Sequence, residues 1–422
     1  MGPRRPDPVD LLTASLDGLL EQLLPIRWGR MAQSPFACFR GTAELMAADL
    51  ARIASTSLTV QLCGDAHVGN FGGFATAERN LVFDLNDFDE TLPGPFEWDV
   101  KRLAASVVLA GRDRGIAPAR CETAARQAVR AYRKEMARFA AMPALDVWYA
   151  RIDAAEAVGS IRAATAERRE AALEKTRKRT SARLLPRLTS LTADGRRIDP
   201  APPLVIPLRD PTLRDAVVDL ATTYGEHVSP ELRHLLGSYE VLDVALKVVG
   251  VGSVGTRCLI VLLAGRDDDD ILFLQVKEAL RSSLEPHLPP TTYAHQGERV
   301  VRGQRLVQAA GDPFLGWTSA VDREFYVRQL HDMKGSFDLT RLTKDTLGDY
   351  AALCGRALSR AHARSGDPVA LAGYLGGSGT FDRAIAAGAV VYADRAEQDH
   401  ARLLEAIRDG RLPTDADESA GP

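Results

Sequence analysis

The sequence lacks the features of several large protein classes. Its five cysteines, Cys38, Cys63, Cys121, Cys258 and Cys354, include no C-x-x-C pair, and their number is odd. This argues against a disulfide framework and a zinc ribbon, and it favours a reducing compartment. No run of about 18 apolar residues occurs, so we expect no membrane span. The first residues carry charge without an apolar segment after them, so we expect no signal peptide and a cytoplasmic location.

An excess of charge of one sign is also missing. The chain has 53 basic and 56 acidic residues, which gives a formal net charge of −3. This balance offers no general electrostatic attraction to nucleic acid or to an anionic membrane. The 422 residues are 45% hydrophobic and 26% charged, as in globular proteins, and are enough for two or three lobes with their own cores.

The first half of the chain is predicted to be mainly helical around two strands. Helical apolar spacing continues to about residue 185, and the mostly charged piece inside it is expected to be a solvated face. A proline-rich stretch then predicts a linker or an irregular excursion. The predicted segments are helices at 9–24, 36–55 and from 97, strands at 57–63 and 80–87 with a glycine-rich loop between them, the charged piece at 164–183 and the linker at 186–213.

The second half begins with a change to β-rich composition near residue 238. Short apolar runs separated by turn signals predict strands, and helical spacing returns towards the end. We expect the acidic turn "GRDDDD" to be solvent-exposed, not a calcium site. The predicted segments are strands at 242–249, 257–264 and 271–277, a helix at 297–310, two strands in "FLGWTSAV" and "EFYVRQL", and helices at 343–364 and 379–408.

The motif "GVGSVG", residues 250–255, indicates which kind of phosphate-binding loop is present. In a dinucleotide-binding fold such glycines open a helix, but here the strand-like "TRCLIVLL" follows them. The phosphate lid of protein kinases has this arrangement: a strand, a glycine loop, a second strand and then a further strand that ends in lysine. We therefore predict a nucleotide site formed by Gly250, Gly252, Ser253, Gly255 and Lys277. The alternative is a glycine-rich hairpin with a surface lysine.

A kinase-type lysine is expected to pair with a carboxylate from the next helix. Between residues 291 and 311 the only acidic residue is Glu298, which makes it the candidate partner of Lys277. Glu278 is also close in sequence and is an alternative.

Two polar stretches near residue 65 provide the remaining groups for phosphoryl transfer. "GDAHVGN" and, after the next apolar run, "NDFDE" supply carboxylates and an amide, which are the hard ligands that magnesium prefers. The first stretch resembles the H-G-D-x-H-x-x-N loop of aminoglycoside phosphotransferases, choline kinases and relatives in the protein-kinase-like superfamily. Cys63 stands at the place of the first histidine, and His67 matches the second.

The resemblance implies a role for each matching residue. Asp65 would be the catalytic base, and Asn70 and Asp87 would be the magnesium ligands, with Asp84 as the rival of Asp87. In "GPFEWDVKRLA", Asp99 would brace the catalytic loop. The implied cofactors are ATP and magnesium.

The order of these motifs differs from that of kinases, because the catalytic loop precedes the glycine loop. Read as a circle, the order is intact, and this predicts a circular permutation. We therefore expect an α+β, two-lobed, protein-kinase-like fold with a small antiparallel β lobe and a mostly helical large lobe. The expected parts are N-terminal helices at 1–56, large-lobe catalytic loops and helices at 57–240, the small lobe at 241–335 and large-lobe helices at 336–422.

The chain also resembles an uncharacterised bacterial family through "SPFACFRG", "GDAHVGNFG", "DFDE" and "QVKEA". That resemblance brings no activity with it. In "SPFACFRG", Arg40 could hold a phosphate or a substrate anion, or could form an ordinary surface ion pair.

The predicted function is an ATP- and magnesium-dependent phosphotransferase that acts on a hydroxyl acceptor, a small molecule rather than a protein. Residues 141–235 are the expected place for a substrate lid. Nucleotidyl transfer and a nucleotide-binding regulatory module without turnover stay open. A calcineurin-like metallophosphatase is disfavoured, because Phe71 stands where its G-N-H motif needs histidine.

Overall fold

The computed structural model describes residues 5–161, 174, 181–193, 195–208, 220, 223–267, 270–320, 322–330 and 335–414. Most of the charged piece at 164–183 and the middle of the "GRDDDD" turn lie outside these residues. The fold is mixed α+β, as expected. Among the described residues, no helix combines the length and apolar character needed to cross a membrane.

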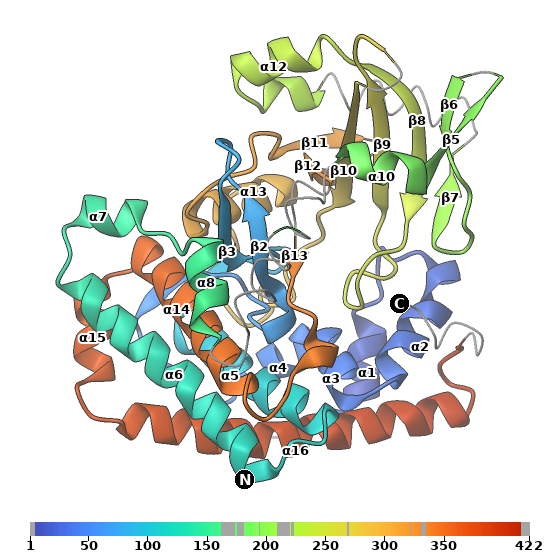
Figure 1. Cartoon of the computed structure of the whole chain (residues 1–422). Helices are drawn as coiled ribbons and strands as arrows, with labels where there is room; N and C mark the ends of the chain where they lie inside the picture. The colour runs from blue at the N-terminus through green and yellow to red at the C-terminus, as the bar shows by residue number, and fades with distance from the viewer. Residues whose placement is uncertain are drawn as a thin grey trace.

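Helices are more abundant than strands in the described part of the chain (Figure 1). The α-helices are α1 (Pro8–Ala14), α2 (Leu24–Ala32), α3 (Pro35–Arg40), α4 (Ala43–Leu50), α5 (Glu97–Asp113), α6 (Pro118–Ala140), α7 (Ala144–Tyr149), α8 (Ala154–Ser160), α10 (Ser181–Leu188), α12 (Pro230–Leu236), α13 (Gln296–Val307), α14 (Leu347–Ser365), α15 (Pro368–Leu375) and α16 (Thr380–Arg408). Short 3₁₀ turns are η1 (Glu21–Leu23), η2 (Val68–Asn70) and η3 (Leu339–Arg341).

The described strands pair antiparallel in four sheets. They are β1 (Thr59–Leu62), β2 (Phe71–Ala75), β3 (Leu81–Leu85), β4 (Leu92–Pro95), β5 (Thr189–Thr192), β6 (Gly195–Ile198), β7 (Val205–Pro207), β8 (Glu240–Lys247), β9 (Cys258–Ala264), β10 (Ile271–Glu278), β11 (Gly316–Ala320), β12 (Arg323–Gln329) and β13 (Gly335–Ser336). The largest sheet has the order β11-β12-β10-β9-β8-β7, and the smaller ones are β13-β2-β3, β1-β4 and β5-β6.

The large sheet is covered on both faces. Its strands alternate, so that Val261 and Leu263 belong to one apolar cluster while Ile260 and Leu262 belong to another. Tyr224 and helix α12 cover the first face, and helix α10 with β6 covers the second. Of the residues that the sequence grouped with the large helical part at 57–240, Leu185, Ile198, Tyr224 and Leu232 thus pack against the large sheet.

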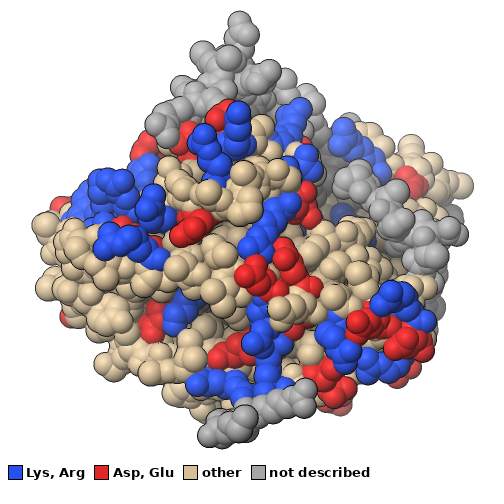
Figure 2. Space-filling model, turned by 90° about the horizontal axis from the view of Figure 1, so that it is seen from below, with Lys and Arg blue, Asp and Glu red and all other residues tan. Residues whose placement is uncertain are grey.

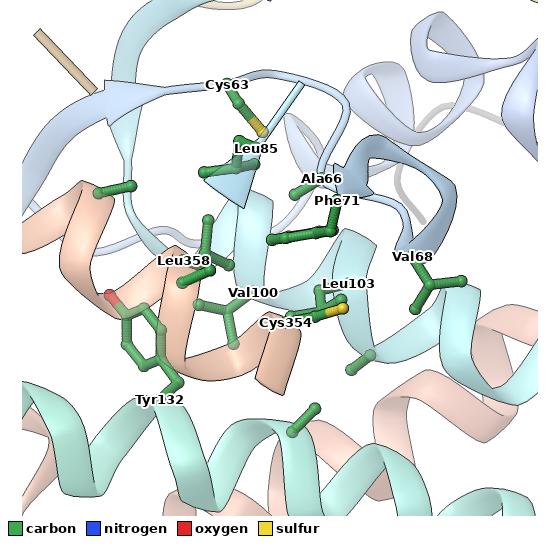
Figure 3. Close-up of a cluster of buried hydrophobic side chains, with 14 of the residues drawn as sticks. Cys63, Ala66, Val68, Phe71, Leu85, Val100, Leu103, Tyr132, Cys354 and Leu358 are labelled. Atoms are coloured by element: carbon green, nitrogen blue, oxygen red, sulfur yellow. The ribbon is translucent and has the colours of Figure 1, made fainter. Parts of the chain in front are cut away.

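The main core lies under the strands β1, β2 and β3. Phe71 and Leu85 are fully buried and pack with residues of α5, α6 and α14, including Tyr132 and Leu358 (Figure 3). Because α14 begins at Leu347, the C-terminal half of the chain supplies the floor for strands formed near residue 70. This packing fixes the loops that follow β1 and β3.

Helix α16 runs along the lower edge of the molecule in Figure 1. Seen from that side, basic and acidic side chains are mixed, and no extended area of one sign covers this face (Figure 2). The pattern agrees with the near-neutral net charge of −3.

Most predicted strands and helices are confirmed, but several predictions are wrong. The expected helix at 9–24 stops at Ala14 and restarts later, with Gly18 between at a φ of 83°. The expected helix at 36–55 divides into α3 and α4. Helix α15 was not expected.

Two segments predicted as irregular contain strands. The glycine-rich loop between the first two predicted strands contains β2, which pairs with β3 from Phe71 opposite Leu85 to Ala75 opposite Leu81. The proline-rich stretch at 186–213 contains β5, β6 and β7. In both places strand pairing outweighs the turn-forming residues around it.

Candidate functional site

The loop that follows β1 is held from below by helix α5. Asp99, in the first turn of α5, accepts hydrogen bonds from the main-chain N–H groups of Cys63 (2.8 Å) and Gly64 (3.1 Å). His362 Nε2 lies 3.3 Å from the same carboxylate, and Tyr132 bonds the other ring nitrogen at 2.9 Å. The structure therefore places Asp99 against the loop, where the sequence comparison expects a bracing residue. His362 and Tyr132 were not predicted.

Gly64 allows the loop to turn at this point. Its φ is 88°, and a Cβ there would lie 2.3 Å from the carbonyl oxygen of Glu90. A side chain would therefore meet the backbone of the "NDFDE" segment. The two predicted polar stretches touch at this glycine.

Asp65 is held by a second residue of α5. Arg102 Nε lies 2.5 Å from Asp65 Oδ1, and the Asn70 side-chain amide donates to the Asp65 carbonyl oxygen at 2.8 Å. Burial raises the pKa of Asp65 above its usual value, Arg102 opposes this, and the nearby carboxylate of Asp87 adds to the rise. A carboxylate with this surrounding can accept a proton more readily than an exposed aspartate. Arg102 is a site residue that the motif comparison missed.

His67 lies beside this carboxylate as a neutral imidazole. Its Nδ1 accepts from the Gly69 N–H at 3.1 Å, and its Nε2 lies 3.5 Å from Asp65 Oδ2. Burial lowers the pKa of His67 well below its ordinary value, and the cations of Arg40 and Arg102 lower it further. With Nδ1 used as an acceptor, the proton resides on Nε2, which faces Asp65.

Lys277 on β10 reaches the "NDFDE" segment, although 188 residues separate it from Asp89. The two side chains form an ion pair, and Tyr326 donates to the other Asp89 oxygen at 2.8 Å. Burial acts to lower the pKa of Lys277, but Asp87 and Asp89 outweigh it and raise the pKa well above its ordinary value. Burial also acts to lower the pKa of Arg328, but Tyr326 and the carboxylates of Asp87 and Asp89 raise it.

The structure separates the two rivals for the metal position. Asp84 is only 1% exposed, and Arg360 Nη2 lies 2.7 Å from both of its carboxylate oxygens. The Ala309 N–H also donates to Asp84 at 3.1 Å. Asp84 thus joins β3 to α14, whereas the charge of Asp87 acts on Lys277 and raises its pKa.

The glycine loop lies between β8 and β9 and is held by the N-terminal helices. Arg27 donates to the carbonyl oxygen of Gly252, and Arg30 donates to that of Gly250 at 2.6 Å. Ser253 Oγ lies 3.4 Å from Asp89 Oδ2. Gly250 and Gly255 have φ values of 66° and 104°, which favour glycine. The loop, Lys277 and the "NDFDE" segment therefore meet at Asp89.

Glu298, which the sequence predicted as the partner of Lys277, does not pair with it. Glu298 on α13 pairs with Arg302, one turn further along the same helix, at 3.3 Å. Glu278 pairs with Arg257 and Arg323 instead. Asp89, which the sequence comparison did not single out, lies in the position where a helix carboxylate was expected.

Helix α13 contributes an arginine to the site region instead. Arg299 is 1% exposed and donates to the carbonyl oxygens of Asp89 (2.9 Å), Thr91 (2.7 Å) and Leu280 (2.8 Å). It therefore fastens the "NDFDE" segment to the β8–β12 sheet and its helix. No motif in the sequence pointed to it.

The arrangement fits a divalent cation that arrives with phosphate groups. Among the described residues, no group of three or more His, Cys, Asp or Glu could hold a metal ion. Magnesium commonly takes one or two protein ligands together with water and substrate phosphates. Asn70 and Asp87 could provide such a pair, since the Asn86 N–H donates to the Asn70 carbonyl at 2.9 Å and holds the two segments together.

Comparisons with known proteins identify a family but no activity. The family model described as "Uncharacterized protein conserved in bacteria (DUF2252)" matches residues 19–406. No curated protein matches the chain. No solved structure matches it either.

Proposed function

The chain belongs to this bacterial family, and we propose that it is an ATP- and magnesium-dependent phosphotransferase with a circularly permuted kinase-like arrangement. The observation that carries the proposal is the meeting of Lys277 and Ser253 at Asp89. Two residues from the glycine-loop sheet contact a carboxylate of the segment that follows β3. A nucleoside triphosphate that binds between these segments needs side chains from both of them to converge in this way.

The order of elements in the large sheet supports the proposal. The glycine loop joins β8 to β9, Lys277 lies on β10, and helix α13 follows before β11 and β12. The chain then enters α14, which packs beneath β1 and β3 and so leads back to the Asp65 loop. The elements succeed one another as in a kinase whose chain has been cut before the catalytic loop.

The residues of the Asp65 loop support a role in orienting a hydroxyl group. In the proposed reaction, Asp65 accepts the proton of the acceptor hydroxyl while Arg102 fixes its carboxylate. Asn70 and Asp87 would hold magnesium, which neutralises phosphate charge when bound. Lys277 would exchange part of its contact with Asp89 for the phosphates. Most of the rate would come from positioning and charge neutralisation.

One observation favours a second candidate, a nucleotide-binding regulatory module without turnover. Lys277 pairs with Asp89 and not with a carboxylate of α13, so the lysine–helix pair of active kinases is replaced. The acceptor in the main proposal is a hydroxyl compound, a small molecule rather than a protein.

An ADP-release assay with a panel of hydroxyl acceptors separates the two candidates. The phosphotransferase proposal predicts acceptor-dependent ADP release by the wild type. It also predicts that Asp65→Asn lowers turnover by at least about 100-fold, since a positioned base contributes roughly that factor, while nucleotide affinity is kept. Nucleotide binding without ADP release on any acceptor supports the regulatory module.

A further inference from the structure

Arg40, the last residue of α3, is a partly buried cation, and no hydrogen bond or ion pair joins its guanidinium to another described residue. Its Nε is buried and has no hydrogen-bond partner, and among the described residues no ion pair compensates its charge. Its guanidinium carbon lies 6.0 Å from the ring centre of Phe36, a weak contact at the edge of the cation–π range. The buried arginines near the site, Arg102 and Arg299, each bond oxygen atoms of the protein.

The surroundings of Arg40 place it between the two loops of the site. A Cβ on Gly69 would lie 3.6 Å from Arg40 Nε, and a Cβ on Gly252 would lie 3.1 Å from the Arg40 carbonyl oxygen. The first glycine belongs to the Asp65 loop and the second to the glycine loop. The glycine loop approaches the Arg40 backbone closely because Gly252 has no side chain, and Gly69 lies within ordinary contact distance of the guanidinium.

The charges that face Arg40 are those of the proposed reaction centre. Burial lowers the pKa of Arg40, and the carboxylates of Asp65 and Asp87 oppose that effect. These carboxylates act through space without forming an ion pair with Arg40. A guanidinium in this position lacks both full hydration and a contacting anion, which is an unfavourable state unless a ligand supplies the anion.

We propose that Arg40 binds the γ-phosphoryl group of the nucleotide and stabilises it during transfer. The inference rests on the proposed function and assigns a catalytic residue to it. A guanidinium presents its N–H groups as a planar fork that matches phosphate oxygens. Arg40 lies against both the Asp65 loop and the glycine loop, between which the terminal phosphoryl group would lie.

The chemical step balances without any further reactant. The bond between the γ-phosphorus and the β,γ-bridging oxygen breaks, and a bond forms between that phosphorus and the acceptor oxygen. The acceptor proton passes to Asp65, and ADP leaves with the bridging oxygen. Arg40 donates to non-bridging oxygens of the moving group and so offsets their charge.

Calorimetric titration with two nucleotides tests this role without a turnover assay. ADP and a non-hydrolysable ATP analogue are titrated, in magnesium, into the wild type, Arg40→Gln and Arg40→Lys. The wild type is expected to bind the triphosphate at least about tenfold more tightly than ADP, the size of one charged hydrogen bond. Arg40→Gln is expected to lose this preference and to bind ADP within about twofold of the wild type.

Arg30→Gln is the matched control, because Arg30 holds Gly250 of the glycine loop at 2.6 Å. It is expected to weaken both nucleotides by the same factor. Arg40→Lys keeps the charge but not the fork, so a several-fold loss confined to the triphosphate is expected, and this variant serves if Arg40→Gln does not fold. Equal effects of Arg40→Gln on both nucleotides, or none, overturn the role of Arg40 alone. Absence of nucleotide binding by the wild type overturns the proposed function as well.

Discussion

Replacing Arg299 by Met is expected to destabilise the protein strongly. Arg299 joins α13 to the backbone that follows β3, because it donates to the carbonyl oxygens of Asp89, Thr91 and Leu280. It is 1% exposed, so water cannot replace the lost donors. Methionine keeps the length and apolar contact of the stem, and the substitution therefore removes mainly the guanidinium.

The magnitude follows from these three contacts. Each hydrogen bond from a charged donor contributes about 1.5–3 kcal/mol, so the three together contribute roughly 5–9 kcal/mol. The variant no longer buries a charge, which offsets part of the loss, so the expected decrease in the free energy of unfolding is about 3–5 kcal/mol. That is a large share of the roughly 5–15 kcal/mol typical of a folded domain.

Urea unfolding followed by circular dichroism measures this decrease, with Arg302→Met as the matched control. Arg302 lies on the same helix but is 49% exposed and pairs only with Glu298 among acidic partners of the described residues. Its replacement is expected to cost about 1 kcal/mol or less. A decrease below about 1 kcal/mol for Arg299→Met, or equal decreases for both variants, would refute the reasoning about the buried carbonyls.

The remaining predictions concern other buried groups of the fold. Asp84→Asn leaves the Arg360 guanidinium buried without its carboxylate, so urea unfolding is expected to show a loss of about 3–5 kcal/mol; a loss below about 1 kcal/mol contradicts the pairing role. Burial lowers the pKa of His400, so the unfolded chain takes up a proton at higher pH than the folded one, and stability is expected to fall as pH drops below about 6.5. His400→Gln is expected to flatten this acid slope in thermal unfolding at several pH values, and an unchanged slope speaks against it. Gly64→Ala places a Cβ 2.3 Å from the Glu90 carbonyl at a φ of 88°, so its melting temperature is expected to drop by several degrees, and a wild-type value contradicts the close contact.

The sequence predicted the secondary structure correctly where the spacing of apolar residues is regular. The three strands that became β8, β9 and β10, and the helix that became α13, follow from period-two and helical patterns with clear turn signals. Strand β2 was missed because its sequence "FGGFA" contains two glycines, and its pairing with β3 is a tertiary contact. Strand β7 in the proline-rich stretch was also missed, because it forms by pairing with β8 and its local sequence does not indicate a strand.

The sequence predicted the candidate site residues that belong to a motif. It did not predict those that come together only through long-range packing. Asp99 contacts the Asp65 loop, the position that the resemblance implies for it, because each of the two residues lies within a motif that the sequence shows. Arg299 and the Lys277–Asp89 pair depend on segments far apart in sequence, and no local pattern predicts which carboxylate a buried lysine meets. Assignment of the lysine partner to Glu298 failed on this point.

The most direct test of the central claim is calorimetric titration of ATP, with and without magnesium, into the wild type and Lys277→Met. Lys101→Met on α5, a half-buried lysine near Glu97, is the control. The account predicts magnesium-dependent binding by the wild type and by the control. It predicts affinity at least about tenfold weaker for Lys277→Met, which loses a charged contact to the phosphates. No binding by the wild type, or equal affinity for Lys277→Met, would contradict a nucleotide site at the meeting point of Lys277, Ser253 and Asp89.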